Sequence, residues 1–351
     1  MTDLRALKLT LYFNETLRSG HELAADRLLA LFDRAGVRTS VLLRGIEGFG
    51  AHHLLHADRF ENTGLNQPVV VVAVDLAERI ESLMPEVDAL LRSGLVTAER
   101  ASLVDDLTGG FAPPEVGDGA VRLTVYCGRG ERFRGLPAHR AIVDAMRTSG
   151  MDGATVFLGV DGTVHGRRER ARLLSRNRDV PLMIVAVGSR RSALDALPAV
   201  GRLVGRPTVT VEGIQVCKRD GLLLAEPAPP RNGGDGAGMW RKLMVHAPGD
   251  THVSGETLHY RLVEELRRTE AAGATSLRGI WGFRGAAAAG GDSVRSLRRA
   301  SPVVTIAIDR EPAMRATWEL IDGLTRGAGL VTSEFVPAHR ILAADAVGSA
   351  L

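Results

Sequence analysis

Two segments in which glycines follow an arginine contain the residue types that can bind an anion. The first runs from Arg44 to Gly50 as RGIEGFG, and the second runs from Arg278 to Gly282 as RGIWG. Glycines let a phosphate approach backbone N–H groups, and a guanidinium binds phosphate through two parallel hydrogen bonds. The spacing matches neither G-x-G-x-x-G nor the P-loop, and a tight bend at a strand end explains the glycines equally well. The candidate ligand-binding residues here are Arg44, Gly45, Glu47, Gly48, Phe49, Gly50, Arg278, Gly279 and Gly282.

Three glutamates recur in a second pattern, each two residues after a threonine. Glu99, Glu212 and Glu334 end the runs Val-Thr-Ala-Glu, Val-Thr-Val-Glu and Val-Thr-Ser-Glu. In a strand, residues two apart share one face, so each Thr–Glu pair could line a ligand cleft. The alternative is that each glutamate pairs with an arginine of a neighbouring copy.

Three long segments, at about 47–67, 161–180 and 281–301, are predicted to be functional or disordered loops. The first contains His52, His53 and His56, a spacing that suits a soft or borderline metal, although solvated histidines are the simpler interpretation. The second is rich in arginines, which either clamp phosphates or an acidic protein partner, or form a solvated face. The candidate partner-binding arginines are Arg167, Arg168, Arg170 and Arg172. The third contains an alanine run from Ala286 to Ala289 that offers no chemistry.

Composition favours a soluble, non-enzymatic protein of the cytoplasm. The chain has 44 basic and 41 acidic residues, and only three of the basic residues are lysines, so we expect no specific nucleic-acid partner. It has no apolar run long enough to span a membrane, and its two cysteines form neither a metal spacing nor a disulfide framework. No hydrolytic motif is present, and no cofactor can be named.

The chain repeats itself three times. Lys8-Leu9-Thr10-Leu11-Tyr12 aligns with a run that begins at Arg122 and with another that begins at Lys242. The RGIEG, LGVDG and RGIWG segments follow at constant spacing, and the three glutamate runs come later in each copy. The predicted organisation is repeat 1 at 5–105, repeat 2 at 120–218 and repeat 3 at 239–341, with linkers at 106–119 and 219–238 and a C-terminal tail at 342–351.

Each repeat shows the pattern of an α+β domain. The first run alternates, with Leu9 and Leu11 on one face and Thr10 and Tyr12 on the other, which predicts a strand. Apolar residues at helical spacing follow, then a strand that ends in Gly-(Ile/Val)-x-Gly, a strand after a shared proline, a second helix and the glutamate strand. The order β-α-β-β-α-β is that of the ferredoxin-like fold. The polar face of the first strand also needs cover, so we expect the three sheets to face one another as an intramolecular pseudo-trimer.

These motifs resemble the PII-like family known as domain-of-unknown-function family 190, three times over. The Lys/Arg-Leu-Thr-x-Tyr strand and the Gly-(Ile/Val)-x-Gly segments carry the resemblance; repeat 2 departs from it, with Leu158 in place of the arginine. The resemblance implies ferredoxin-like protomers, ligand clefts between them and a long loop that contacts targets. The function so implied is a regulator that binds a small anionic ligand, for example a nucleotide. The alternatives are a scaffold that binds only a protein partner, and metal handling through the histidines of repeat 1.

Overall fold

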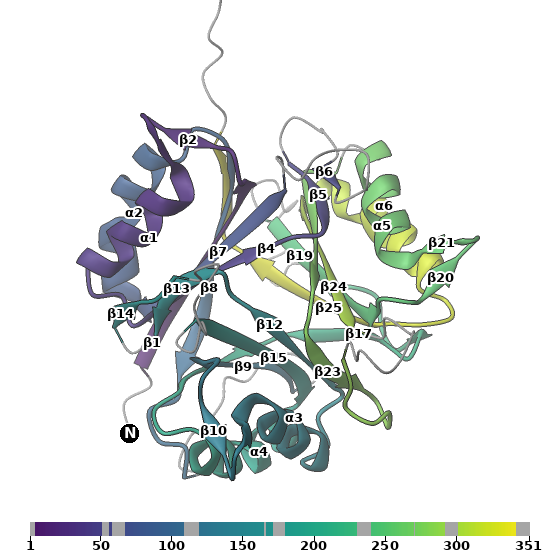
Figure 1. Ribbon diagram of the computed structural model, residues 1–351. Coiled ribbons are helices and arrows are strands. Elements are labelled where there is room, and N and C mark those ends of the chain that lie inside the picture. Colours follow the sequence, from purple (N-terminus) through teal and green to yellow (C-terminus); the bar gives the residue numbers. More distant parts are fainter. Residues whose placement is uncertain are drawn as a thin grey trace, which may run out of the picture.

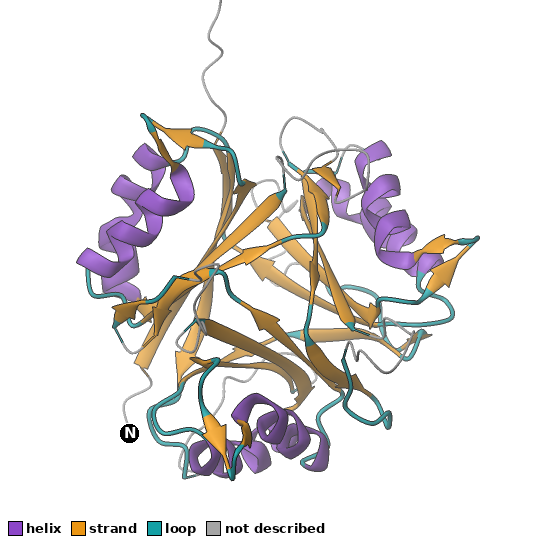
Figure 2. Cartoon of the chain, viewed as in Figure 1, coloured by secondary structure: helices purple, strands orange, loops and turns teal. Residues whose placement is uncertain are grey.

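The computed structural model describes residues 4–50, 56–57, 67–108, 119–164, 166–170, 180–229, 240–269, 271–291 and 301–341. Figure 1 shows three units around a common centre, each with a sheet toward the centre and a pair of helices outside. Figure 2 shows the same arrangement by element type, with helices at the periphery and strands inside. No helix within the described ranges has both the length and the apolar character that crossing a bilayer requires.

Repeat 1 has the predicted mixture of helices and antiparallel strands. Its elements are β1 (Leu4–Asn14), α1 (Ala24–Arg34), β4 (Thr39–Arg44), β7 (Pro68–Leu76), α2 (Ala77–Leu90) and β8 (Gly94–Leu103). The strands lie side by side in the order β4-β7-β1-β8, and every neighbouring pair is antiparallel. The second strand, β4, therefore pairs directly with the third, β7, and the first strand, β1, lies between the third and the fourth.

Repeats 2 and 3 follow the same plan. Repeat 2 consists of β9 (Ala120–Gly128), α3 (Ala138–Thr148), β12 (Gly153–Leu158), β15 (Pro181–Ser189), α4 (Arg190–Leu203) and β16 (Thr208–Gly213). Repeat 3 consists of β19 (Trp240–Pro248), α5 (Leu258–Arg268), β22 (Gly273–Arg278), β24 (Pro302–Arg310), α6 (Glu311–Leu324) and β25 (Leu330–Val336). Short hairpins add β2 (Arg18–Ser19) to β3 (Glu22–Leu23), β10 (Arg132–Phe133) to β11 (Leu136–Pro137), and β20 (His252–Val253) to β21 (Glu256–Thr257).

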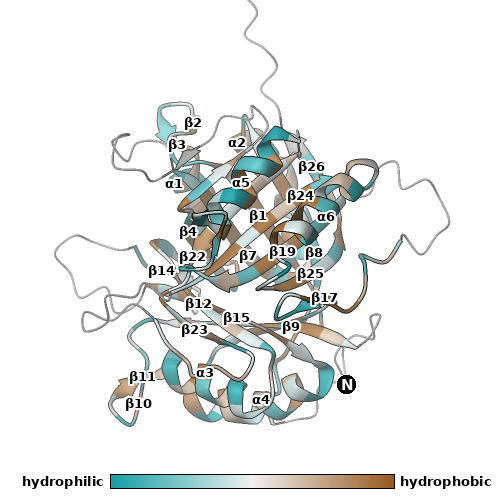
Figure 3. Ribbon diagram, turned by 90° about the vertical axis from the view of Figure 1, so that its right-hand side faces the viewer, coloured by the Kyte–Doolittle hydropathy of each residue, from teal (hydrophilic) through white to brown (hydrophobic). Residues whose placement is uncertain are grey.

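The alternation of apolar residues divides the interior into outer cores and one shared inner core. Leu9 and Leu11 of β1 pack under α1 and α2, with Leu28 and Phe32 of α1 fully buried there. The opposite faces of the three sheets supply a single inner cluster, to which Val72, Met183 and Ile306 come from different repeats. Figure 3 shows brown, hydrophobic residues on the central strands and teal, hydrophilic stretches on the helices. Burial of both sheet faces is the main force that joins the repeats.

A short strand after the second strand of each repeat crosses to a neighbouring sheet. β5 (Glu47–Phe49) pairs with β22 of repeat 3, β13 (Asp161–Val164) with β4 of repeat 1, and β23 (Trp281–Arg284) with β12 of repeat 2. The prediction that one strand continues through Gly-(Ile/Val)-x-Gly is therefore wrong. The second strand ends before the first glycine, and the chain then leaves its own repeat.

The ends of the repeats make a second set of exchanges, in the opposite direction. The end of β8 pairs with β16, β17 (Gln215–Arg219) pairs with β25, and β26 (Ala338–Ile341) pairs with β8. Smaller strands β6 (His56–Ala57), β14 (Arg167–Arg168) and β18 (Leu222–Leu223) lie at sheet edges. Cys217 on β17 accordingly packs in the core of repeat 3, whereas Cys127 packs in the core of repeat 2.

Candidate functional site

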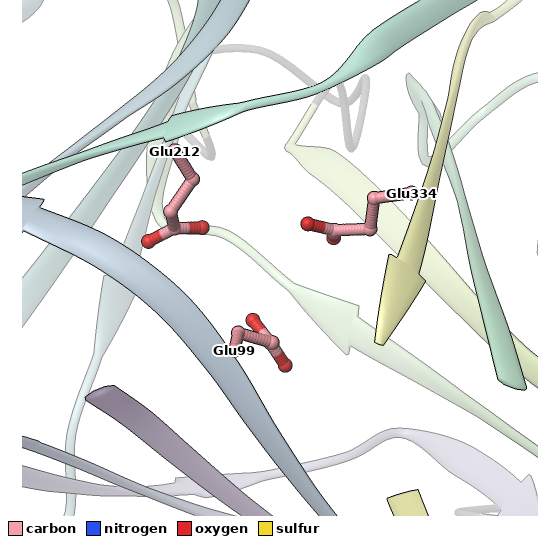
Figure 4. Close-up of side chains that lie close together, drawn as sticks. All are labelled: Glu99, Glu212 and Glu334. Atoms are coloured by element: carbon pink, nitrogen blue, oxygen red, sulfur yellow. The ribbon is translucent and has the colours of Figure 1, made fainter. Parts of the chain in front are cut away.

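The three glutamates meet on the central axis of the molecule. Figure 4 shows Glu99, Glu212 and Glu334 pointing toward one another from β8, β16 and β25. One carboxylate oxygen of each lies within 4.8 Å of the others. Directly opposite them on the first strands of the repeats stand Lys8, Arg122 and Lys242.

These six side chains form a closed ring of alternating charge, here called the axial ring. Each cation contacts the glutamate of its own repeat and that of another repeat. Lys8 lies 2.6 Å from Glu99 and also contacts Glu212; Arg122 lies 2.8 Å from Glu212 and 2.5 Å from Glu334; Lys242 lies 2.7 Å from both Glu334 and Glu99. All six side chains are at most 8% exposed. Every repeat is thus tied to both others by charge.

The pKa shifts of Glu99 and Lys8 agree with charged groups in a shared field, whereas at Lys242 burial outweighs the two glutamates and lowers the pKa. Burial by itself would raise the pKa of Glu99, yet Lys242 and Lys8 hold that pKa well below its ordinary range. Burial would lower the pKa of Lys8, but Glu212 and Glu99 raise it above the usual value for lysine. Three carboxylates so close together are also a donor set for a cation, but the three basic side chains already supply the compensating charge. The residues therefore fit an internal ion-pair ring better than a metal centre.

Farther along the axis lies a layer of aromatic side chains. Tyr12, Tyr126 and His246 occupy equivalent positions, four residues after the cation of each repeat. The hydroxyl of Tyr126 and Nε2 of His246 are buried, and no residue within the described ranges forms a hydrogen bond with either. Burial and, secondarily, Arg122 lower the pKa of His246 to about 3, so its imidazole is neutral at neutral pH.

The glycines of the Gly-(Ile/Val)-x-Gly segments stand where the crossing strands touch another repeat. A Cβ at Gly48 would lie 2.7 Å from the carbonyl oxygen of Ala274 in repeat 3. A Cβ at the equivalent Gly162 would collide with the carbonyl oxygen of Ser40 in repeat 1, and Gly282 is placed in the same way against repeat 2. The close approach of two backbones requires glycine at these positions.

The first glycine of each segment is also confined by protein atoms. A Cβ at Gly45 would lie 2.8 Å from the ring of Pro68 and 3.1 Å from the methyl group of Thr275. A Cβ at Gly279 would meet the methyl group of Thr155 at 2.5 Å. In all three repeats the segment is therefore an inter-repeat contact.

The places where a crossing strand meets another repeat are here called junctions. At each of the three junctions a different residue precedes the second glycine of the segment, and it makes different contacts. At the junction of repeats 1 and 3, Glu47 of β5 is buried and its carboxylate contacts Nδ1 of His259, the second residue of α5. The pair joins two repeats through one carboxylate and one imidazole.

At the junction of repeats 2 and 1 the equivalent residue is Asp161. Its carboxylate accepts from Nη2 of Arg168 at 2.8 Å, and Arg170 lies 3.6 Å from it. Both arginines also approach Asp26 of α1, at 3.4 and 3.1 Å. Arg168 and Arg170, which the sequence offered as partner-binding residues, thus form ion pairs within the chain.

At the junction of repeats 3 and 2 the equivalent residue is Trp281. The guanidinium of Arg140, on α3, lies 4.4 Å from the centre of a ring of Trp281. His139 precedes it on the helix, at the position that His259 has in repeat 3. Nδ1 of His139 and Nε1 of Trp281 are buried and find no hydrogen-bond partner among the described residues.

A cavity of about 510 Å³ opens between repeats 1 and 3. It lies where β1 ends and β5 begins to pair with β22, and its lining is mostly apolar. Six lining residues matter below: Tyr12, Arg18, Phe49, Gly50, Thr275 and Ile306. The volume suits a small organic molecule.

Of the predicted ligand-binding residues, the structure brings Phe49 and Gly50 to this cavity. Arg44 does not line it and is paired with Glu15, with Nε at 2.9 Å and Nη2 at 2.5 Å from one carboxylate oxygen. Arg278, its equivalent in repeat 3, lies beside Gly249, which stands where repeat 1 has Glu15. The anion-binding role of the two arginines stays a prediction.

Several predicted positions cannot be placed. His52, His53 and Arg172 lie outside the described residues, and only the backbone of His56 is described, in β6. Arg167 is exposed on β14. The metal-binding hypothesis therefore stays a prediction.

Sequence reasoning missed Lys8, Arg122 and Lys242 as members of the axial ring. They open the repeated strand motif and lie on the same face as Thr10 and Thr124, a face that the sequence already predicted to be buried. Lysine is also rare here: the chain has only three, and Lys8, Lys218 and Lys242 are all buried. A recurring cation on a buried face was the available signal.

The molecule is thus a tandem-repeat α+β protein whose repeats share one core. Residues 6–103, 120–216 and 240–338 match the model of the DUF190 family, described as uncharacterized ACR. The chain belongs to this family and contains three copies of its domain in tandem, as the sequence predicted.

A relative and a solved structure give further comparisons. UPF0166 protein MJ1524 of Methanocaldococcus jannaschii is 26% identical over 94 residues, which are 26% of this chain and 86% of that protein. That relative is therefore about as long as a single repeat. The crystal structure of aspartate kinase from Synechocystis aligns with 94% of this chain and 43% of that one, with 11% identity and a TM-score of 0.25, which is too low to carry any argument.

Proposed function

We propose that the chain is a PII-like regulatory protein, without enzymatic activity, that binds a small anionic ligand in the cavity between repeats 1 and 3. Each repeat would be a ferredoxin-like domain, and the three together an intramolecular pseudo-trimer. The strand order β4-β7-β1-β8 and the shared inner core support that arrangement. A relative of about one repeat's length supports the view that the chain is a fusion of units that occur singly elsewhere.

The cavity between repeats 1 and 3 is the observation that carries the proposal. Phe49 and Ile306 offer apolar surface for a flat or apolar group, and Thr275 and Tyr12 add polar atoms. Arg18 donates a hydrogen bond to the carbonyl of His21 at 2.8 Å and has no carboxylate partner among the described residues. A nucleotide has both the apolar base and the negative charge that such a lining accommodates.

The place of the cavity supports a regulatory role. Gly50, which lines it, is the last residue before the long segment that leads to β7. A ligand against Phe49 and Gly50 would contact the start of that segment and could alter how it meets a protein partner. The residues at the three junctions differ, which agrees with ligand binding at only one of them.

A thermal-shift screen of adenine and guanine nucleotides on the full chain tests the proposal. A ligand present at about a hundred times its Kd should stabilise the protein by about 2.7 kcal/mol and raise Tm by several degrees. Arg18→Ala should weaken binding about tenfold, whereas Arg191→Ala, an exposed arginine of α4, should leave it unchanged. The proposal fails if no nucleotide raises Tm or if Arg18→Ala binds as tightly as the native protein.

A further inference from the structure

The three junctions place equivalent residues together but balance their charges differently. A carboxylate of the crossing strand meets a basic group at two of them, through Glu47 with His259 and through Asp161 with Arg168. At the third, Trp281 replaces the carboxylate while the basic side chains of repeat 2 remain. That junction therefore differs from the other two in charge.

Three arginines of repeat 2 gather around this third junction. Arg129 and Arg140 are exposed and have no carboxylate partner among the residues that the structure describes. Arg132 donates to the backbone carbonyls of Arg129 and Glu131 at the long distances of 3.4 and 3.5 Å. The carboxylate of Glu131 accepts from the backbone N–H of Gly128.

The short strand that contains Arg132, β10, packs against α3, the helix of His139 and Arg140. The pKa of His139 is lowered to about 4, first by burial and then by Arg140, Arg132 and Arg129. The imidazole is thus neutral at pH 7 in a field set by three positive charges.

A single atom gives the most direct comparison between junctions. Nδ1 of His259 contacts the carboxylate of Glu47, whereas Nδ1 of the equivalent His139 is buried and has no hydrogen-bond partner in the described part of the chain. Nε1 of Trp281 is likewise buried and has no hydrogen-bond partner among the described residues. A buried polar group without a partner costs free energy, and such groups in native proteins call for a physical explanation.

We infer that the junction of repeats 3 and 2 is an anion-binding site for a small phosphorylated molecule, with Arg129, Arg132 and Arg140 as its charged groups. A ligand oxygen would take the role that the Glu47 carboxylate has beside His259. Three permanently charged guanidinium groups match a dianion or polyanion better than a single carboxylate, and phosphate suits their forked geometry. Arg140 would turn from the indole of Trp281 toward the ligand. The site is separate from the cavity between repeats 1 and 3 and does not depend on the proposed function.

Titration calorimetry of the full chain with pyrophosphate, at constant ionic strength, tests the inference. We expect saturable binding, a change in tryptophan fluorescence as Arg140 leaves the indole, and a Kd about tenfold weaker or more in Arg140→Ala. Arg191→Ala is the matched control, since that arginine belongs to the same repeat and is 92% exposed on its side chain. It should change Kd less than about twofold.

Trp281→Glu is the sharper variant, because it gives repeat 3 the residue that repeat 1 has. The new carboxylate should pair with His139 and the arginines and abolish pyrophosphate binding while Tm is kept. Arg18→Ala should bind pyrophosphate normally, which separates this site from the cavity. The inference is overturned if no saturable binding occurs, if Arg140→Ala and Trp281→Glu bind as tightly as the native chain, or if citrate binds as tightly as pyrophosphate.

Discussion

The axial ring and the three junctions are built from the same repeated motifs, yet they have diverged to different degrees. On the axis every repeat contributes one cation and one glutamate, and the only variation is arginine in place of lysine at Arg122. At the junctions the equivalent residues are Glu47, Asp161 and Trp281, each with different contacts.

The difference follows from how each place is constrained. Each group of the ring contacts two others in a buried site, so losing one charge leaves one uncompensated charge, and two neighbours that each lack a partner, in a medium of low dielectric constant. Each junction is a contact between two repeats only, and its basic side chain is more exposed than any group of the ring. Fusion into one chain lets each junction change independently, whereas the ring must change as a unit.

The largest expected effect comes from Arg122→Ala. It would leave Glu212 and Glu334 each with one cation instead of two, and breaking a buried ionic network in this way costs about 3–5 kcal/mol. Urea denaturation measures the loss in the free energy of unfolding.

Two variants calibrate that result. Arg122→Lys gives repeat 2 the cation that the other repeats have and should cost less than half as much. Arg168→Ala breaks a partly exposed junction pair and should cost about 1 kcal/mol or less. If Arg122→Ala cost no more than Arg168→Ala, the contrast between ring and junction would be wrong.

The second effect concerns the backbone contact that all junctions share. Gly162→Ala would press a methyl group onto the carbonyl oxygen of Ser40, at a residue whose φ of +150° already disfavours a side chain. We expect a loss of about 2–3 kcal/mol, again from urea denaturation. Gly50→Ala is the control, because nothing lies within 4 Å of a Cβ there, and it should change stability by less than about 0.5 kcal/mol. Equal effects of the two substitutions would contradict the interpretation of the motif as a close contact.

Local patterns were enough to predict the elements of each repeat. The alternation of Leu9 and Leu11 with Thr10 and Tyr12 depends only on neighbours in sequence, and so does the helical spacing of Leu28 and Phe32. The three copies also support one another, because a hydrophobic pattern that is ambiguous in one copy recurs at the same place in the other two.

The crossing strands and the axial ring could not be predicted in the same way. β5 is three residues long and has its partner, β22, more than two hundred residues away, so no local pattern specifies the pairing. The glutamates were predicted either to line a cleft or to pair between repeats, but Lys8 was assigned to a strand face without a partner. Which loop faces the cavity depends on tertiary packing as well. Phe49 and Gly50 were candidates because they belong to the glycine-rich segment, whereas Arg18 reaches the same cavity only through the fold.

The smallest expected effect is a loss of stability at low pH that comes from His246 in the aromatic layer and not from the axial ring. His246 has a pKa of about 3 in the folded protein, against about 6.5 for an ordinary histidine, because it is buried near Arg122. As pH falls below 6.5 the unfolded chain binds a proton at this residue and the folded chain does not, so stability is lost between pH 6.5 and 3.

Between pH 7 and 5 this single group should cost roughly 2 kcal/mol. His246→Tyr installs the residue that repeats 1 and 2 have at this position, Tyr12 and Tyr126, and removes the titration. Urea denaturation of both proteins at the two pH values should show the native chain losing roughly 2 kcal/mol more than the variant. Glu99 and Glu334 of the axial ring stay charged throughout this window, since the pKa of each lies below the ordinary range of a glutamate. Equal losses in the two proteins would contradict this prediction, because they would mean that His246 binds a proton as readily in the folded protein as in the unfolded chain.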